Sequence, residues 1–185
     1  FTRLKEYFSF GLPLLPRSVS FWLVMLGDRY IISFFLGAAA VGVYSAAYGV
    51  GNLLYAFIGV LTLPLQANLI YLYDGGRLEE VRTHIRYSLK YLLLVGIPFV
   101  CGAVILARPI LNAFTTKEIS AQGSIILPLS AIAILILGIH NIVSIVLLLT
   151  KKTTILALIW VGGAAINIAL NIIAVPHFGI IGAAL

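Results

Sequence analysis

The stretch GVYSAAYGVGNLLYAFIGVLTLPLQANLIYL, Gly42 to Leu72, contains no charged side chain. As a helix it would be ~46 Å long, more than the ~30 Å hydrocarbon core of a bilayer, so it must tilt, bend at Pro64 or project beyond the lipid. The whole chain is 62% hydrophobic and 10% charged, with a mean hydropathy of +1.12. Soluble domains are about 45 to 50% apolar. The sequence therefore predicts an all-α, polytopic transmembrane helix bundle.

Hydropathy and helix breakers predict membrane helices at about 12–36, 42–72, 87–107, 123–150 and 154–175, with a sixth starting near 179. Pro13 and Pro16 should bend the first helix near its start. We treat residues 1–185 as a single transmembrane domain. Because the chain begins without Met and stops inside a new apolar run, we expect it to be a fragment of a longer protein.

Most basic residues outside the apolar runs fall on one side of this topology. The opposite side comprises the turn Ala38 to Val41, the segment Arg108 to Gln122 and Pro176 to Phe178, and it holds only Arg108 and Lys117. Cytoplasmic loops are enriched in lysine and arginine, so the first side is predicted to be cytoplasmic, in the cell (inner) membrane. Its basic residues are Arg3, Lys5, Arg77, Arg82, Arg86, Lys90, Lys151 and Lys152.

The segment Leu78 to Leu92 is amphipathic. Apolar residues follow a helical spacing there, while Arg82, Arg86 and Lys90 sit four apart on another stripe. The pattern predicts a helix lying at the cytoplasmic interface, with basic side chains reaching toward lipid headgroups. We assign it no role in substrate binding.

A polar stripe runs along the predicted helix 42–72. Its members recur every three or four residues and keep within a ~100° sector of the helix. Polar groups in hydrocarbon are costly unless they find partners or water, so this face should line a cavity or pack against another helix through interhelical hydrogen bonds. The stripe consists of Ser45, Tyr48, Asn52, Tyr55, Gly59, Thr62 and Gln66.

The first predicted helix carries Arg17, Asp28 and Arg29 at membrane depth. Adjacent residues on a helix point ~100° apart, so we expect Asp28 and Arg29 not to neutralise each other directly. Arg17 shares the azimuth of Asp28 but is ~16 Å away along the axis. We expect the partners of these side chains on other helices, in water or on a ligand, and a structural ion pair with an absent helix remains the alternative.

Other polar residues give weaker signals. Asn167 and Asn171 lie four apart with Gly163 on the same face, which indicates close packing with a hydrogen bond. The three histidines lack metal-ligand spacing, and the chain has no phosphate-binding loop, dinucleotide fingerprint or nucleophile elbow. We therefore expect no enzyme, cofactor, metal or nucleic-acid partner.

The ordered motifs resemble a known family. GLPLLP followed by DRYIISFFLGAAAVGVYSAAYGVGNLL, and the tail NIALNIIAVPHFGIIGAAL, are similar to the second half of the polysaccharide (O-antigen type, lipid-linked oligosaccharide) flippases. These belong to the multidrug/oligosaccharidyl-lipid/polysaccharide exporter superfamily. The resemblance implies the second six-helix lobe of a two-lobe exporter, with its last helix truncated and its N-terminal lobe missing from this chain.

The resemblance also implies a function. Such proteins move polyprenyl-diphosphate-linked oligosaccharides, as units for polysaccharide or lipopolysaccharide biosynthesis, across the cytoplasmic membrane by alternating access, often coupled to an ion gradient. We expect Arg17 and Arg29 to contact the diphosphate, because guanidinium groups bind phosphate through paired, charge-assisted hydrogen bonds. Asp28 is the candidate for ion coupling. The substrate-contacting stripe residues are predicted to be Tyr48, Asn52, Tyr55 and Gln66.

Three alternatives remain open. A drug/cation antiporter of the same superfamily would favour an acidic, aromatic cavity, whereas the first helix has two arginines against one aspartate. A membrane glycosyltransferase or polymerase would use the same lipid-linked sugars but usually needs a large extramembrane loop. A scaffold without transport is the third.

Overall fold

The computed structural model describes residues 11–12 and 14–184, and every regular element in this part of the chain is helical. Five helices are long and apolar enough to cross a membrane, which confirms the polytopic helical bundle. Arg3, Lys5 and Pro13 lie outside the described residues. The helices are α2 (Leu14–Leu36), α3 (Ala38–Gly51), α4 (Leu53–Asp74), α5 (Leu78–Phe114), α6 (Lys117–Gly123), α7 (Ile126–Leu149) and α8 (Thr153–Phe178), followed by the 3-10 turn η1 (Gly179–Ile181).

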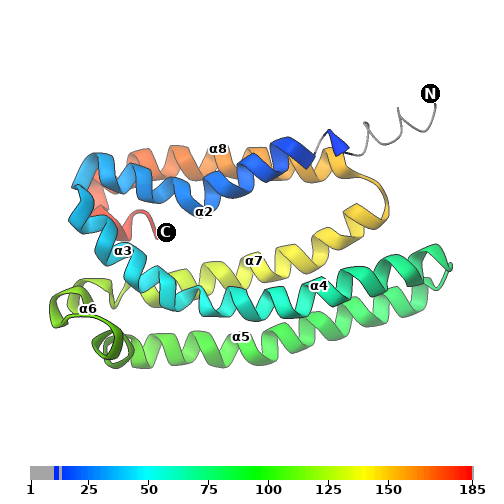
Figure 1. The fold of residues 1–185 in the computed structure, drawn as a ribbon, viewed down its shortest axis with the longest axis horizontal. Coiled ribbons are helices and arrows are strands. Elements are labelled where there is room, and N and C mark those ends of the chain that lie inside the picture. Colours follow the sequence, from blue (N-terminus) through cyan, green and yellow to red (C-terminus); the bar gives the residue numbers. More distant parts are fainter. Residues whose placement is uncertain (1–10, 13, 185) are drawn as a thin grey trace. The chain divides into compact units, whose positions relative to one another are not determined.

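The chain divides into two compact units, formed by residues 1–40 with 146–183 and by 41–145 with 184–185. The first unit is built on α2 and α8, which lie side by side and run in the same direction (Figure 1). The rings of Phe21 and Trp160 meet edge to face, with centroids 5.6 Å apart. Because α8 is followed by a sharp turn at Gly179 (φ 61°), Gly182 comes into close contact with the Ala174 carbonyl. Apolar burial and this turn together hold the pair.

In the second unit, glycines allow α7 to approach the neighbouring helices. A methyl group at Gly138 would meet Ile58 of α4 and Leu92 of α5, and one at Gly51 of α3 would overlap Ser130 of α7. Small residues at helix contacts let backbones approach closely, which favours packing in lipid where the hydrophobic effect between helices is weak. These contacts form the core of the α3, α4, α5 and α7 packing.

The segment expected as one helix at 42–72 is divided and begins earlier. The chain turns at Gly37, between α2 and α3, where the φ of 84° suits glycine. The predicted turn Ala38 to Val41 is instead the first turn of α3. Asn52 separates α3 from α4 yet keeps helical dihedrals of −67° and −10°. The backbone N–H of Asn52 donates to the Tyr48 carbonyl at 2.8 Å, and its backbone carbonyl accepts from the Tyr55 N–H at 3.0 Å. The helical turn therefore tightens here and the chain keeps its direction.

The third predicted helix is much longer than expected. The amphipathic segment and the apolar run join in the 37-residue α5, which contains Pro98 and Pro109. The interfacial segment is therefore the start of a spanning helix, since no breaker separates the two. The segment from Arg108 also remains helical, first in α5 and then in α6, and Pro176 to Phe178 belong to α8.

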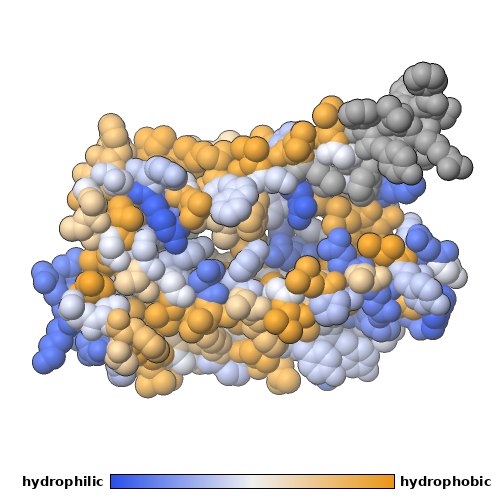
Figure 2. Space-filling model, in the orientation of Figure 1, coloured by the Kyte–Doolittle hydropathy of each residue, from blue (hydrophilic) through white to orange (hydrophobic). Residues whose placement is uncertain are grey.

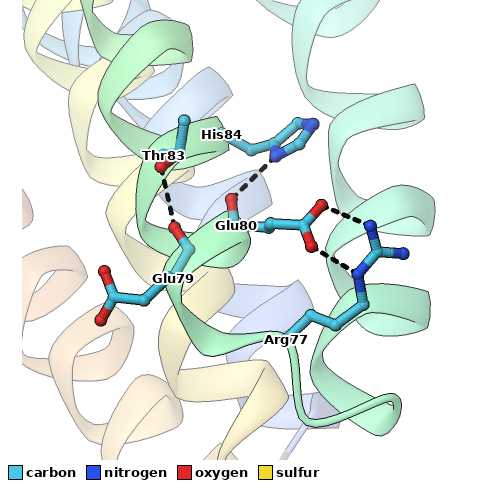
Figure 3. Close-up of polar contacts among 5 residues, drawn as sticks. All are labelled: Arg77, Glu79, Glu80, Thr83 and His84. Carbon is cyan, nitrogen blue, oxygen red and sulfur yellow. Dashed lines mark hydrogen bonds and ion pairs between the residues drawn. The ribbon is translucent and has the colours of Figure 1, made fainter.

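A short turn at Gly75 and Gly76 (φ 71°) joins α4 to α5. Figure 3 shows the paired hydrogen bonds from the Arg77 guanidinium to the Glu80 carboxylate, at 2.5 Å each. The hydrogen bond and charge of Glu80 raise the pKa of Arg77. Glu79 and Glu80 also lie in the first turn of α5, where negative charge complements the helix dipole.

Both units expose many large apolar side chains, and Figure 2 shows orange patches of them on the face that it draws. In a soluble protein such continuous patches would cause aggregation, whereas in a bilayer they contact lipid. The most exposed include Phe34, Val60, Leu63, Ile105 and Phe114.

Candidate functional site

Asp28 and Arg29 contact each other, contrary to the prediction from helical geometry. The nearest charged atoms, Arg29 Nη1 and Asp28 Oδ1, are 3.5 Å apart. The long guanidinium stem bends back toward the helix N-terminus, which overcomes the ~100° divergence of the two Cα–Cβ bonds. The same Nη1 donates to the Met25 carbonyl at 2.7 Å, so this backbone contact is the shorter of the two. Asp28 is 5% exposed.

Arg17 lies near the start of α2, eleven residues before Asp28. Its Nε atom is buried and has no hydrogen-bond partner among the described residues. A buried donor on a permanently charged group is costly unless a partner arrives. Arg17 is therefore suited to an anionic ligand.

α8 adds two asparagines to the polar part of this unit. Asp28 and Asn167 each lie seven residues beyond the contacting rings of Phe21 and Trp160, so on parallel helices they stand at the same level. Asn171 lies one turn further and donates from Nδ2 to the Asn167 carbonyl at 2.9 Å. The Oδ1 atoms of both asparagines are buried without a hydrogen-bond partner in the part of the chain described. Two successive turns of this helix pair thus combine a buried carboxylate with two amide oxygens that lack partners among the described residues.

The polar stripe follows a partly exposed side of α3 and α4. None of its seven members is buried, whereas the neighbouring residues Tyr44, Ala47, Leu54 and Ile58 are. Asn52 and Gln66 are exposed, and Tyr48 and Tyr55 are half-buried. The stripe is therefore partly accessible along its whole length.

Local contacts orient some of these side chains. The ring of Tyr48 stacks on that of the buried Tyr44, with centroids 5.7 Å apart and planes at 25°. The Thr62 hydroxyl donates to the Ile58 carbonyl at 2.8 Å, which satisfies it two residues before Pro64. Tyr48 thus offers a supported aromatic surface, while the hydroxyl of Thr62 is engaged by its own helix.

The structure places Arg17, Asp28 and Arg29 on α2 in the first unit and brings only Asp28 and Arg29 into contact. Tyr48, Tyr55 and Gln66 lie on α3 and α4 in the second unit, with Asn52 at the junction of these two helices. Sequence reasoning treated Asn167 and Asn171 only as packing residues. Their oxygens remain unsatisfied, and Gly163 has no atom within 4 Å of an added Cβ. The four-residue spacing of these two side-chain amides at membrane depth was the sequence feature that could have marked them as candidate site residues.

A match to a family model shows which protein family the chain belongs to. The model for MatE matches residues 13–173, which is most of the chain. The chain belongs to the MatE family. With five described helices able to span a membrane, this MatE chain is a multi-pass membrane protein.

This MatE chain also resembles a curated protein. It is 25% identical over 166 residues to the Probable flippase AglR of Haloferax volcanii, a match that covers 85% of this chain and 33% of that relative. The chain therefore spans about a third of the length of the relative it matches. No solved structure matches it.

Proposed function

We propose that the protein flips polyprenyl-diphosphate-linked oligosaccharides across the cytoplasmic membrane by alternating access, driven by an ion gradient. The supporting observation is the basic character of α2, a spanning helix with two arginines and one aspartate. The diphosphate must leave the headgroup layer and enter a medium of low dielectric constant. Fixed guanidinium groups replace part of its hydration by bidentate hydrogen bonds.

Arg17 has the stronger structural case for a diphosphate contact, because its buried Nε lacks a partner among the described residues. Arg29 already donates to Met25 and lies near Asp28, so substrate binding there would rearrange an existing contact. We propose Arg17 as a primary contact and Arg29 as a contact that exchanges Asp28 for phosphate during transport.

The sugar portion needs a different surface. Tyr48 and Tyr55 offer aromatic faces for the apolar side of sugar rings, and the amides of Asn52 and Gln66 bond hydroxyl groups. None of these four residues is buried, and Asn52 and Gln66 are exposed, so a substrate can reach part of each side chain. We propose them as sugar contacts, completed in the full-length protein by the N-terminal lobe.

Ion coupling is proposed at Asp28. Its buried carboxylate lies level with Asn167, and the oxygens of Asn167 and Asn171 lack partners in the described structure. A proton on Asp28, or a monovalent cation among these oxygens, would neutralise the carboxylate. Neutralisation would release Arg29 toward the diphosphate, and so couple the two binding events.

The test is flipping of a fluorescent lipid-linked oligosaccharide by the full-length protein in proteoliposomes. Arg29→Ala is expected to slow flipping at least tenfold while membrane insertion stays intact. Arg108→Ala is the matched control, because it removes the same side chain at an exposed position at the far end of α5.

The proposal fails if the wild-type protein leaves the labelled lipid asymmetric under every ion gradient tested. Export of cationic drugs under those gradients, without lipid flipping, would instead establish a drug/cation antiporter. Normal flipping by well-expressed Arg29→Ala would remove Arg29 from the site.

A further inference from the structure

Two open grooves flank the first turns of α5. The larger, of about 600 Å³, is lined mainly by apolar surface. The smaller, of about 300 Å³, contains Thr83 and Tyr87. Arg86 and Lys90 line both, so these two cations form a ridge between an apolar groove and a smaller one that contains two hydroxyl groups. The larger groove is lined by Arg82, Ile85, Arg86, Leu89, Lys90 and Leu93.

No acidic side chain among the described residues neutralises the charge on this ridge. Arg82 pairs with Glu79 at 2.7 Å, but Arg86 and Lys90 form no ion pair with any described residue. Residues four apart on a helix lie ~6 Å apart along its axis, a spacing at which one phosphate can contact both. The ridge therefore attracts an anion of the size of a phosphate group.

The apolar stripe beside the ridge restricts the kind of anion. Ile85, Leu89 and Leu93 repeat every four residues and continue toward the apolar part of α5. A soluble phosphate would leave this surface in contact with water, whereas an acyl chain would cover it. The smaller groove adds the hydroxyl groups of Thr83 and Tyr87, which suit a polar headgroup.

We propose that these grooves bind one anionic phospholipid, with its phosphate on Arg86 and Lys90, its headgroup beside Thr83 and Tyr87, and an acyl chain along Ile85, Leu89 and Leu93. The ridge lies on the predicted cytoplasmic side, where a leaflet rich in anionic lipid attracts clustered basic residues. This site is separate from the residues proposed for transport.

The test is native mass spectrometry of the full-length protein titrated with phosphatidylglycerol. The wild-type protein should retain phosphatidylglycerol in preference to phosphatidylcholine. Arg86→Gln/Lys90→Gln is expected to weaken apparent affinity about tenfold, since each cation near the surface contributes to anionic-lipid binding. Arg86→Lys keeps the charge and should stay within about threefold of the wild type, which confirms that the site depends on charge rather than on an altered fold.

The matched control is Lys151→Gln/Lys152→Gln, which removes two exposed cations on the same predicted side. It should change affinity by less than about twofold. Equal losses in both double variants would reduce the effect to general surface charge and overturn the proposal. Tight binding of glycerophosphoglycerol, which lacks acyl chains, would do so as well. Binding of a polyprenyl diphosphate without phosphatidylglycerol would show a substrate site instead.

Discussion

Gly138 in α7 is the position at which one added methyl group tests the packing of the second unit. A Cβ there would lie 2.7 Å from Ile58 Cδ1 and 3.1 Å from Leu92 Cδ2, against 3.4 Å for ordinary contact. Ile58 and Leu92 are both fully buried and belong to two different helices. Gly138→Ala must therefore displace α4, α5 or the side chains between them.

The expected magnitude follows from two opposing effects. Overpacking a well-packed core costs about 1 to 3 kcal/mol. Replacing glycine by alanine inside a helix favours the helix by about 1 kcal/mol. Gly102→Ala in α5 gains the same propensity without a clash, because no atom lies within 4 Å of its added Cβ. The difference between the two variants should therefore equal the packing cost alone, about 1 to 3 kcal/mol.

The assay is equilibrium unfolding of the full-length protein in mixed detergent micelles, followed by circular dichroism. Ile58→Val shortens the clashing side chain and should recover part of the loss in the Gly138→Ala background, although alone it costs about 0.5 to 1.5 kcal/mol. Equal stability of Gly138→Ala and Gly102→Ala would refute the close approach of α7 to α4 and α5.

Three further predictions concern charged and amide groups. Asp28→Asn should abolish the dependence of flipping on an ion gradient while the protein still folds; an unchanged response in proteoliposomes would exclude Asp28 from coupling. Asn167→Leu removes a buried oxygen without a partner in the described residues, so the melting temperature should stay the same or rise. The dependence of flipping on the ion gradient should weaken in the same variant, as a flipping assay would show. Arg77→Gln breaks an exposed ion pair with Glu80 and should leave the melting temperature nearly unchanged.

The sequence predicted the helical class and most of the spanning segments because long apolar runs dominate hydropathy. The first and last residues of these helices depend on backbone features that hydropathy does not measure. Gly37 breaks the chain through its positive φ, while the alanines after it are strong helix formers, so the expected turn became helix. The amphipathic start of α5 looked separate because its composition changes, yet backbone hydrogen bonding continues across such a change.

The candidate site was predictable in part. Periodicity identified a polar stripe whose members are all at least partly exposed in the structure, and its role as a cavity lining or a helix contact stays a prediction. The Asp28 and Arg29 contact was missed because the argument followed Cβ directions and ignored the reach of a guanidinium. The unsatisfied oxygens of Asn167 and Asn171 depend on which neighbours surround them, and spacing along one helix does not contain that information.

The length of α5 has a consequence for how the protein meets membranes of different thickness. At 37 residues it extends ~55 Å, about 25 Å more than the hydrocarbon core. No proline lies between Leu78 and Ile97, so the boundary between lipid and water can move by a whole turn along this stretch without breaking a backbone hydrogen bond. Hydrophobic mismatch costs only fractions of a kcal/mol per Å, about the scale of one helix-surface contact. α5 can thus accommodate bilayers of different thickness. A thicker or thinner membrane changes which residues of α5 contact water, while the helix itself stays intact.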